Sequence, residues 1–133
     1  MRLENEGIKN IIFDLGGVLI NIDPGRSHAA LKRFSGARYS ELQRDAAASN
    51  VFNEYERGTL DSDQFRTFFR KYVDDEVTNE RFDLAWNAML MDIPNSRIDL
   101  LLELRKHYRI FLLSNTNEIH MTRINHYIDA VYG

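Results

Sequence analysis

The sequence contains no cysteine, no long hydrophobic run and no excess of positive charge. Without cysteine, disulfide bonds, zinc–thiolate sites and a cysteine nucleophile are excluded. The longest apolar stretch, residues 11–20, is interrupted by Asp14 and is too short to cross a bilayer. The polar N-terminal residues do not resemble a signal peptide. Because the net charge is -3, we expect neither nucleic acid nor a membrane as a partner, and we expect a cytoplasmic protein.

The composition is that of a soluble globular protein, with 44% hydrophobic and 28% charged residues. The apolar runs at residues 11–13 and 109–113 predict two buried strands. Six helices are expected, marked by these capping or first residues: Asp23–Pro24, Ser40, Ser62, Thr78, Pro94–Asn95 and Glu118. The second helix should run to Gly58, the fifth to His107 and the sixth to Tyr127. Residues 129–132 should begin a third strand.

This order of elements predicts an α/β protein, in which a partial Rossmann-like parallel sheet carries an inserted helical cap. The insertion of roughly 70 residues is far longer than an ordinary crossover. We therefore expect a core domain of residues 1–23 and 93–133 and a four-helix cap of residues 24–92. Two parallel strands alone make a poorly covered sheet, so the core looks incomplete. Either a C-terminal portion or a second copy would complete it, and we include self-association among the expectations.

Aromatic side chains recur at helical spacing within the expected cap. Phe65, Phe69, Tyr72 and Trp86 are predicted to form helix-packing core rather than a substrate pocket. The four histidines show no spacing that would join a carboxylate pair in a metal site, and we expect them in solvent or at helix ends.

Two clusters of polar residues follow the predicted strands. Asp14 ends the first strand and is followed by Gly16 and Gly17, whose backbone can approach an anion closely. Ser114 and Asn115 end the second strand, just before a helix. Ligands of open α/β sheets bind at the carboxyl ends of strands, which favours a functional site here. The alternatives are a turn-capping aspartate and a plain helix N-cap.

Residues 11–23, IIFDLGGVLINID, resemble the first motif of the haloacid dehalogenase-like (HAD) hydrolase superfamily, and residues 110–116, IFLLSNT, resemble its second motif. The segment between them, with YERGTLDSDQF at 55–65 and the helix that carries Trp86, resembles the cap that this superfamily inserts. The resemblance spans nearly the whole chain and corresponds to the N-terminal portion of the family. It is strongest to the sugar-phosphatase-like branch with a D-L-G-[GN]-V first motif, and it extends to the N-terminal phosphatase domain of some epoxide hydrolases.

The resemblance implies a Mg²⁺-dependent phosphatase that acts on a small phosphometabolite such as a sugar phosphate. Asp14 would be the nucleophile and would form an aspartyl-phosphate. Asp14 and the backbone carbonyl of Gly16 would bind Mg²⁺. Ser114, Asn115 and Gly17 would hold the phosphate.

Gly16 stands where many family phosphatases carry a second aspartate as general acid and base. Asp23 is a candidate substitute, although a helix N-cap before Pro24 is the preferred interpretation of this residue. The third-motif lysine and fourth-motif acidic pair are absent from the 133 residues, which we therefore expect to be inactive alone. Two alternatives remain: a metal-independent 2-haloacid dehalogenase-type hydrolase, and a degenerate member that binds a phosphometabolite or a protein partner without turnover.

Overall fold

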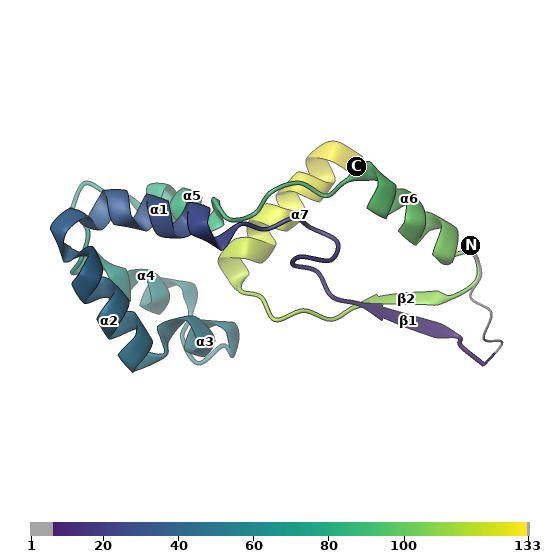
Figure 1. Ribbon diagram of the computed structural model, residues 1–133, viewed down its shortest axis with the longest axis horizontal. Helices are drawn as coiled ribbons and strands as arrows, with labels where there is room; N and C mark the ends of the chain where they lie inside the picture. The colour runs from purple at the N-terminus through teal and green to yellow at the C-terminus, as the bar shows by residue number, and fades with distance from the viewer. Residues whose placement is uncertain (1–6, 133) are drawn as a thin grey trace. The chain divides into compact units, whose positions relative to one another are not determined.

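Figure 1 shows the computed structural model of the chain, which describes residues 7–132. Its elements follow the order β1 (Asn10–Phe13), α1 (Pro24–Ser35), the 3-10 helix η1 (Gly36–Arg38), α2 (Tyr39–Ser49), α3 (Val51–Glu56), α4 (Ser62–Arg70), α5 (Asn79–Asn87), α6 (Asn95–Leu104), β2 (Arg109–Leu112) and α7 (Glu118–Tyr132). They form two compact units. The sheet unit comprises the residues up to Ile22 together with Leu90–Asn115, and the helical unit comprises Asp23–Met89 together with the residues from Thr116 onward.

The two strands lie side by side and run in the same direction (Figure 1). Asn10 pairs with Arg109, and Phe13 pairs with Leu112, so both strands end at the same edge of the sheet. Parallel strands need a long crossover between them, and here the crossover contains all the helices from α1 to α6. The predicted α/β fold class is confirmed.

The expectation that the strands are buried is wrong for the residues that the structure describes. Ile12 is 64% exposed and its register partner Phe111 is 51% exposed, so one face of the sheet is open. The reason is that a sheet of two strands offers too little surface for layers on both faces.

Within the sheet unit, side-chain hydrogen bonds join the start of α6 to the segment that leaves the first motif. Arg97 donates to Asn21 Oδ1 at 2.8 Å, and Asn21 Nδ2 donates to Asp92 Oδ1 at 3.0 Å. The helix predicted to reach His107 ends at Leu104 instead. There the Leu104 carbonyl accepts the N–H groups of both His107 and Tyr108, at 3.0 and 2.9 Å, which turns the chain into β2.

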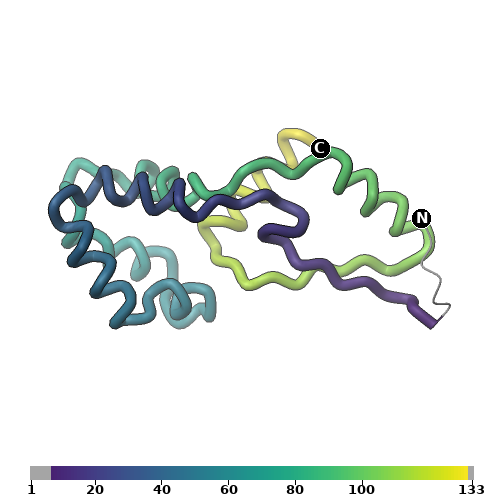
Figure 2. Tube along the Cα trace, viewed as in Figure 1, coloured from purple at the N-terminus to yellow at the C-terminus, as the bar shows by residue number. Residues whose placement is uncertain are grey.

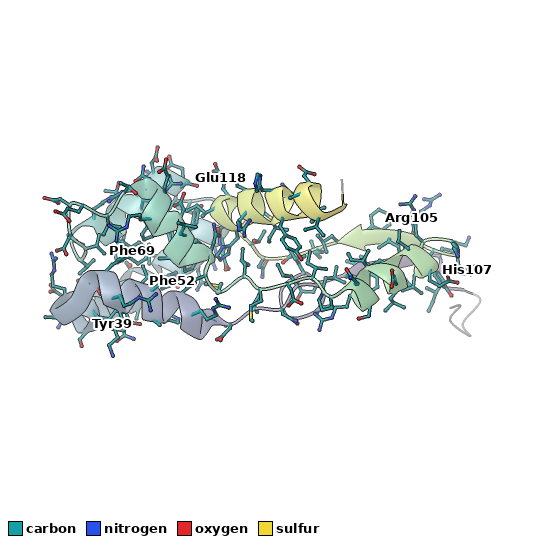
Figure 3. All side chains as sticks on the ribbon, turned by 90° about the horizontal axis from the view of Figure 1, so that it is seen from above. Tyr39, Phe52, Phe69, Arg105, His107 and Glu118 are labelled. Atoms are coloured by element: carbon teal, nitrogen blue, oxygen red, sulfur yellow. The ribbon has the colours of Figure 1, made fainter. Side chains whose placement is uncertain are left out.

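The helical unit is organised around a cluster of aromatic side chains. Phe65 and Phe69 are fully buried, and each packs against the rings of Phe52 and Phe82. Figure 3 labels Phe52 and Phe69, whose ring centroids lie 6.0 Å apart. Tyr72 and Trp86 belong to the same cluster, so the prediction of a helix-packing core is confirmed.

Three capping interactions define where these helices begin. The side chains of Asp23 and Thr78 accept backbone N–H groups of the first turns of α1 and α5, at 3.2 and 3.1 Å, which confirms both predicted caps. The prediction for α4 is wrong by one residue, because Asp61 rather than Ser62 is its N-cap. Asp61 Oδ1 accepts from Gln64 N at 2.7 Å, and Gln64 Oε1 accepts from Asp61 N at 2.9 Å, which is a capping box.

The helix predicted from Ser40 to Gly58 is also corrected. Helix α2 begins at Tyr39 directly after η1 and has no side-chain cap, so Ser40 lies inside the helix. The continuous helix is broken at Asn50, which has a φ of 56° and separates α2 from α3. Asparagine is among the few residues that adopt this left-handed conformation readily.

The third strand predicted at residues 129–132 is wrong, since α7 continues to Tyr132. No glycine or proline interrupts residues 118–132, so nothing in the sequence ends this helix earlier. Helix α7 also groups with the helical unit, whereas residues 93–133 were expected in the core domain. The Ile119 N–H near its start donates to the Tyr55 hydroxyl at 3.1 Å. None of the helices that the structure describes is long and apolar enough to cross a membrane.

Candidate active site at the strand ends

The parallel register brings the ends of both motifs to one place. Leu113 N donates to Phe13 O at 2.9 Å, so pairing continues one residue beyond β2. Asp14 follows Phe13 directly, and Ser114 follows Leu113. A pocket of about 360 Å³ opens at this edge, lined by Asp14, Gly16, Ile22, Leu113, Ser114 and Asn115. The structure therefore brings together four of the residues singled out from the sequence.

A tight turn after Asp14 shapes one wall of this pocket. Figure 2 shows the trace folding back on itself immediately after β1. The Leu15 carbonyl accepts the N–H groups of residues 18, 19 and 20, and Gly17 N donates to Ile20 O at 2.8 Å. Gly17 has a φ of 75°, a conformation that favours glycine. Leu15 and Ile20 are buried and anchor the turn, whereas the Asp14 carboxylate is exposed.

Two of the predicted site residues lie elsewhere. Gly17 is not among the residues that line the pocket, and its N–H is already bonded to Ile20. Asp23 belongs to the helical unit, where its carboxylate accepts from Gly25 N as the cap of α1. The N-cap interpretation of Asp23 is thus the one that the structure supports.

The oxygen atoms at this pocket suit a hard divalent cation. Asp14 Oδ1 accepts from Leu15 N at 2.8 Å, and the described residues provide no hydrogen-bond donor to its other oxygen or to the Gly16 carbonyl. Mg²⁺ prefers such oxygen ligands and is commonly held by one or two carboxylates together with water and phosphate oxygens. Within residues 7–132, no three or more acidic, histidine or cysteine side chains are grouped so that they could hold a metal ion. Asp14 and Gly16 would therefore supply only part of a coordination shell.

A pocket of about 570 Å³ in the helical unit is larger than the Asp14 pocket, but none of the predicted site residues lines it. It is lined in part by Arg66 and Asp83, which form two hydrogen bonds at 2.8 and 2.7 Å. The bond to Asp83 raises the pKa of Arg66. Because the Arg66 guanidinium is already paired with the Asp83 carboxylate, Arg66 is not free to bind an anion in this pocket.

Sequence reasoning missed a buried polar cluster around the start of α7. The His120 ring stacks on Trp86 at 4.8 Å, and His120 Nδ1 lies 2.8 Å from Asn87 Oδ1. Burial lowers the pKa of His120 to about 4. Asn117 Oδ1 accepts from Trp86 Nε1 at 3.3 Å and from His120 N at 2.9 Å. His120 lies in the first turn of α7, so it is at a helix end as expected, but it is buried rather than in solvent.

Comparison with known proteins places the whole arrangement in context. The chain is 34% identical over 115 residues to a D-ribitol-5-phosphate phosphatase of Bacteroides thetaiotaomicron, a match that covers 86% of this chain and 56% of the relative. No family model matches the chain.

Solved structures show the same relationship. A HAD family enzyme from Bacteroides thetaiotaomicron superposes with a TM-score of 0.80 at 38% identity, over 88% of this chain and 58% of that one. Its complex with magnesium and inorganic phosphate gives a TM-score of 0.78 at 39% identity, over 89% and 58%. A HAD-like family hydrolase from Porphyromonas gingivalis gives 0.70 at 35%, over 84% and 53%. The chain thus spans somewhat more than half the length of these relatives.

Proposed function

Because this chain belongs to the haloacid dehalogenase-like superfamily and spans somewhat more than half the length of its relatives, we propose that the protein hydrolyses a small phosphate ester with Asp14 as nucleophile. The observation that carries the proposal is the single pocket shared by Asp14, Ser114 and Asn115 at the ends of β1 and β2. A relative that is a D-ribitol-5-phosphate phosphatase supports a sugar or polyol phosphate as the substrate class.

In the first step an Asp14 carboxylate oxygen attacks phosphorus, and the bond from phosphorus to the substrate oxygen breaks. An aspartyl-phosphate forms, and the alcohol leaves with a proton taken from water. Water is the proton donor in this proposal, because Gly16 stands two residues after the nucleophile and has no side chain that could donate a proton. A second water then hydrolyses the acyl phosphate, which releases inorganic phosphate and restores the carboxylate. Asp23 as a substitute acid remains a prediction.

The phosphoryl oxygens need donors that are fixed before the reaction. Ser114 would supply its hydroxyl and Asn115 its backbone N–H, and both residues line the same pocket as Asp14. Gly17 is left out of this set because its N–H already donates to Ile20. The exposed position of Asp14 leaves its carboxylate open to an incoming ester.

Mg²⁺ is the metal that this donor set would hold, through the Asp14 carboxylate and the Gly16 carbonyl. A magnesium and phosphate complex of a HAD family relative supports this choice. When bound, the ion would neutralise negative charge on the phosphoryl oxygens. The Leu15 N–H orients the carboxylate by donating to Asp14 Oδ1, and the other carboxylate oxygen accepts no hydrogen bond from the described residues.

The test is hydrolysis of D-ribitol 5-phosphate and 4-nitrophenyl phosphate by the full-length protein with Mg²⁺. Asp14→Asn should lower kcat by about a thousandfold or more, because the nucleophile is removed. Asp99→Asn, which changes an exposed carboxylate of α6 outside the pocket, is the matched control and should leave kcat unchanged. Equal rates for Asp14→Asn and the parent protein would exclude Asp14 as nucleophile.

Removal of the metal separates this proposal from the dehalogenase alternative. A chelator should abolish phosphate release, and added Mg²⁺ should restore it. Halide release from a 2-haloacid that is insensitive to the chelator would favour carbon chemistry instead. Cytoplasmic location and self-association stay predictions, and light scattering of the purified protein would test the second.

A further inference from the structure

Two apolar residues of the Asp14 pocket have no role in the reaction proposed above. All the residues that line this pocket belong to the sheet unit, so the pocket is formed within one part of the chain. The residues without a role are Ile22 and Leu113, which are 40% and 71% exposed. Apolar side chains are stabilised by contact with carbon rather than with phosphate oxygens. They therefore form the part of the pocket that suits the carbon skeleton of an ester.

Ile22 packs directly against Gly16, two residues after the nucleophile. A Cβ atom at position 16 would lie 3.5 Å from Ile22 Cδ1 and 3.9 Å from Ile22 Cγ2, which are ordinary contact distances. Gly16 lacks the positive φ of Gly17, so its backbone conformation does not itself require glycine. The space on the side of Gly16 where a Cβ would point is therefore occupied by Ile22.

Backbone pairing holds Ile22 in this position. Ile22 forms an antiparallel bridge with Leu90. Asn21, immediately before it, donates its N–H to the Asp92 carbonyl at 2.9 Å and accepts the Met91 N–H at 2.8 Å. Branching at Cβ also limits the isoleucine side chain to few rotamers. Ile22 is thus a fixed wall of the pocket rather than a side chain that moves aside easily.

Of the two apolar residues, Ile22 is the one at the reacting end of the pocket. It contacts Gly16, whose carbonyl we assign to Mg²⁺ beside the phosphoryl group. The carbon bonded to the ester oxygen is only two bonds from phosphorus. This carbon, rather than a more distant part of the substrate, is therefore the one that we expect to contact Ile22.

We propose that Ile22 is a specificity-determining residue that selects phosphate esters of primary alcohols over esters of secondary alcohols. In a primary ester the carbon bonded to the ester oxygen carries one carbon substituent, whereas in a secondary ester it carries two. The second substituent would have to enter space that Ile22 occupies, and such crowding weakens binding of the transition state. The inference rests on the proposed phosphatase function and narrows its substrate class. One relative is named for D-ribitol 5-phosphate, which is a primary ester.

The test compares two isomers of equal composition and charge, glycerol 1-phosphate and glycerol 2-phosphate, as substrates of the full-length protein with Mg²⁺. The first is a primary ester and the second is a secondary ester. In the parent protein, kcat/KM for glycerol 1-phosphate should exceed that for glycerol 2-phosphate by about tenfold or more, which is the effect of one misplaced carbon in an apolar pocket. Ile22→Ala should bring the two values to within about threefold of each other.

Two further variants separate this role from a structural one. Ile22→Val removes only Cδ1, the atom nearest to Gly16, and should give an intermediate ratio even if Ile22→Ala does not fold. Ile12→Ala makes the matched truncation at a residue that is 64% exposed and does not line the pocket, and it should keep the parent ratio. A general loss of structure would lower kcat/KM for both isomers alike and leave their ratio unchanged.

Equal kcat/KM values for the two isomers in the parent protein would overturn the inference, as would an unchanged ratio in Ile22→Ala and Ile22→Val. Hydrolysis of 4-nitrophenyl phosphate would show in that case that the proposed function itself still holds. If the parent protein hydrolyses neither isomer, isothermal titration calorimetry decides the inference. Glycerol 1-phosphate should then bind more tightly than glycerol 2-phosphate, and Ile22→Ala should remove the difference. Equal affinities, or no binding of either isomer, would overturn the inference independently of catalysis.

Discussion

His120 should make the helical unit sensitive to acid. Its ring is stacked on Trp86, and Nδ1 is hydrogen-bonded to Asn87, with no carboxylate among these partners. Burial therefore lowers its pKa from the ordinary value of 6.5 to about 4. In the unfolded chain the imidazole is hydrated and regains the ordinary pKa. Protons consequently bind the unfolded state more tightly, and acidification favours unfolding.

The size of the effect follows from the difference between the two pKa values. Well above pH 6.5 the imidazole is neutral in both states, and the stability associated with the lowered pKa is fully present. As the pH falls toward 4, the unfolded state becomes protonated while the folded state does not, and this stability is lost. The lowered pKa corresponds to about 3 kcal/mol in total. About 2 kcal/mol of this should be lost between pH 7.5 and pH 5.

Urea denaturation followed by circular dichroism at both pH values measures this loss. His120→Phe keeps an aromatic ring beside Trp86 but cannot bind a proton, so its free energy of unfolding should fall by about 2 kcal/mol less than that of the parent protein. His126→Phe, at an exposed position of α7, is the control and should behave like the parent. The Tyr72 hydrogen bond lowers the pKa of Asp45 from its ordinary value of 3.8, so the stability linked to Asp45 is lost only at lower pH and does not contribute between pH 7.5 and pH 5. Equal losses in His120→Phe and the parent would refute the reasoning.

Two further predictions concern the stability of the helical unit. Phe65→Ala should lower the free energy of unfolding by about 3–5 kcal/mol, because Phe65 is fully buried among aromatic rings. As a control, Leu84→Ala changes a side chain that is 69% exposed and should alter the free energy of unfolding by less than about 0.5 kcal/mol. Thermal melts that show the same loss of stability in both variants would contradict the assignment of the core. Asp61→Ala should cost about 1 kcal/mol by removing the cap of α4, and an unchanged melting temperature would show that the capping box is not stabilising.

The helices and strands were predictable where the residue types of a segment favour the same structure that the packing of the fold requires. The apolar runs that end at Asp14 and Ser114 identified both strands, and the caps at Asp23 and Thr78 were visible as residue types before a periodic apolar segment. The errors arose where several local solutions compete. Asp61 and Ser62 are both good caps, and only the reciprocal bond with Gln64 selects Asp61. The break at Asn50 depends on a backbone conformation that residue type permits but does not impose.

That Asp14 and Ser114 line one pocket was predictable, because the carboxyl ends of parallel strands lie at the same edge of a sheet. The register, in which Phe13 pairs with Leu112, aligns the two strand ends. The cluster around Asn117 and His120 was not, because its contacts join residues 31 to 64 positions apart. One local signal was nevertheless available. An ionised aspartate caps a helix with an oxygen and brings no donor, whereas an asparagine also brings an NH₂ group that the cap does not use. For an asparagine directly before a predicted helix, the sequence therefore predicts a need for an acceptor near its NH₂ group, and none of the described residues provides one for Asn117.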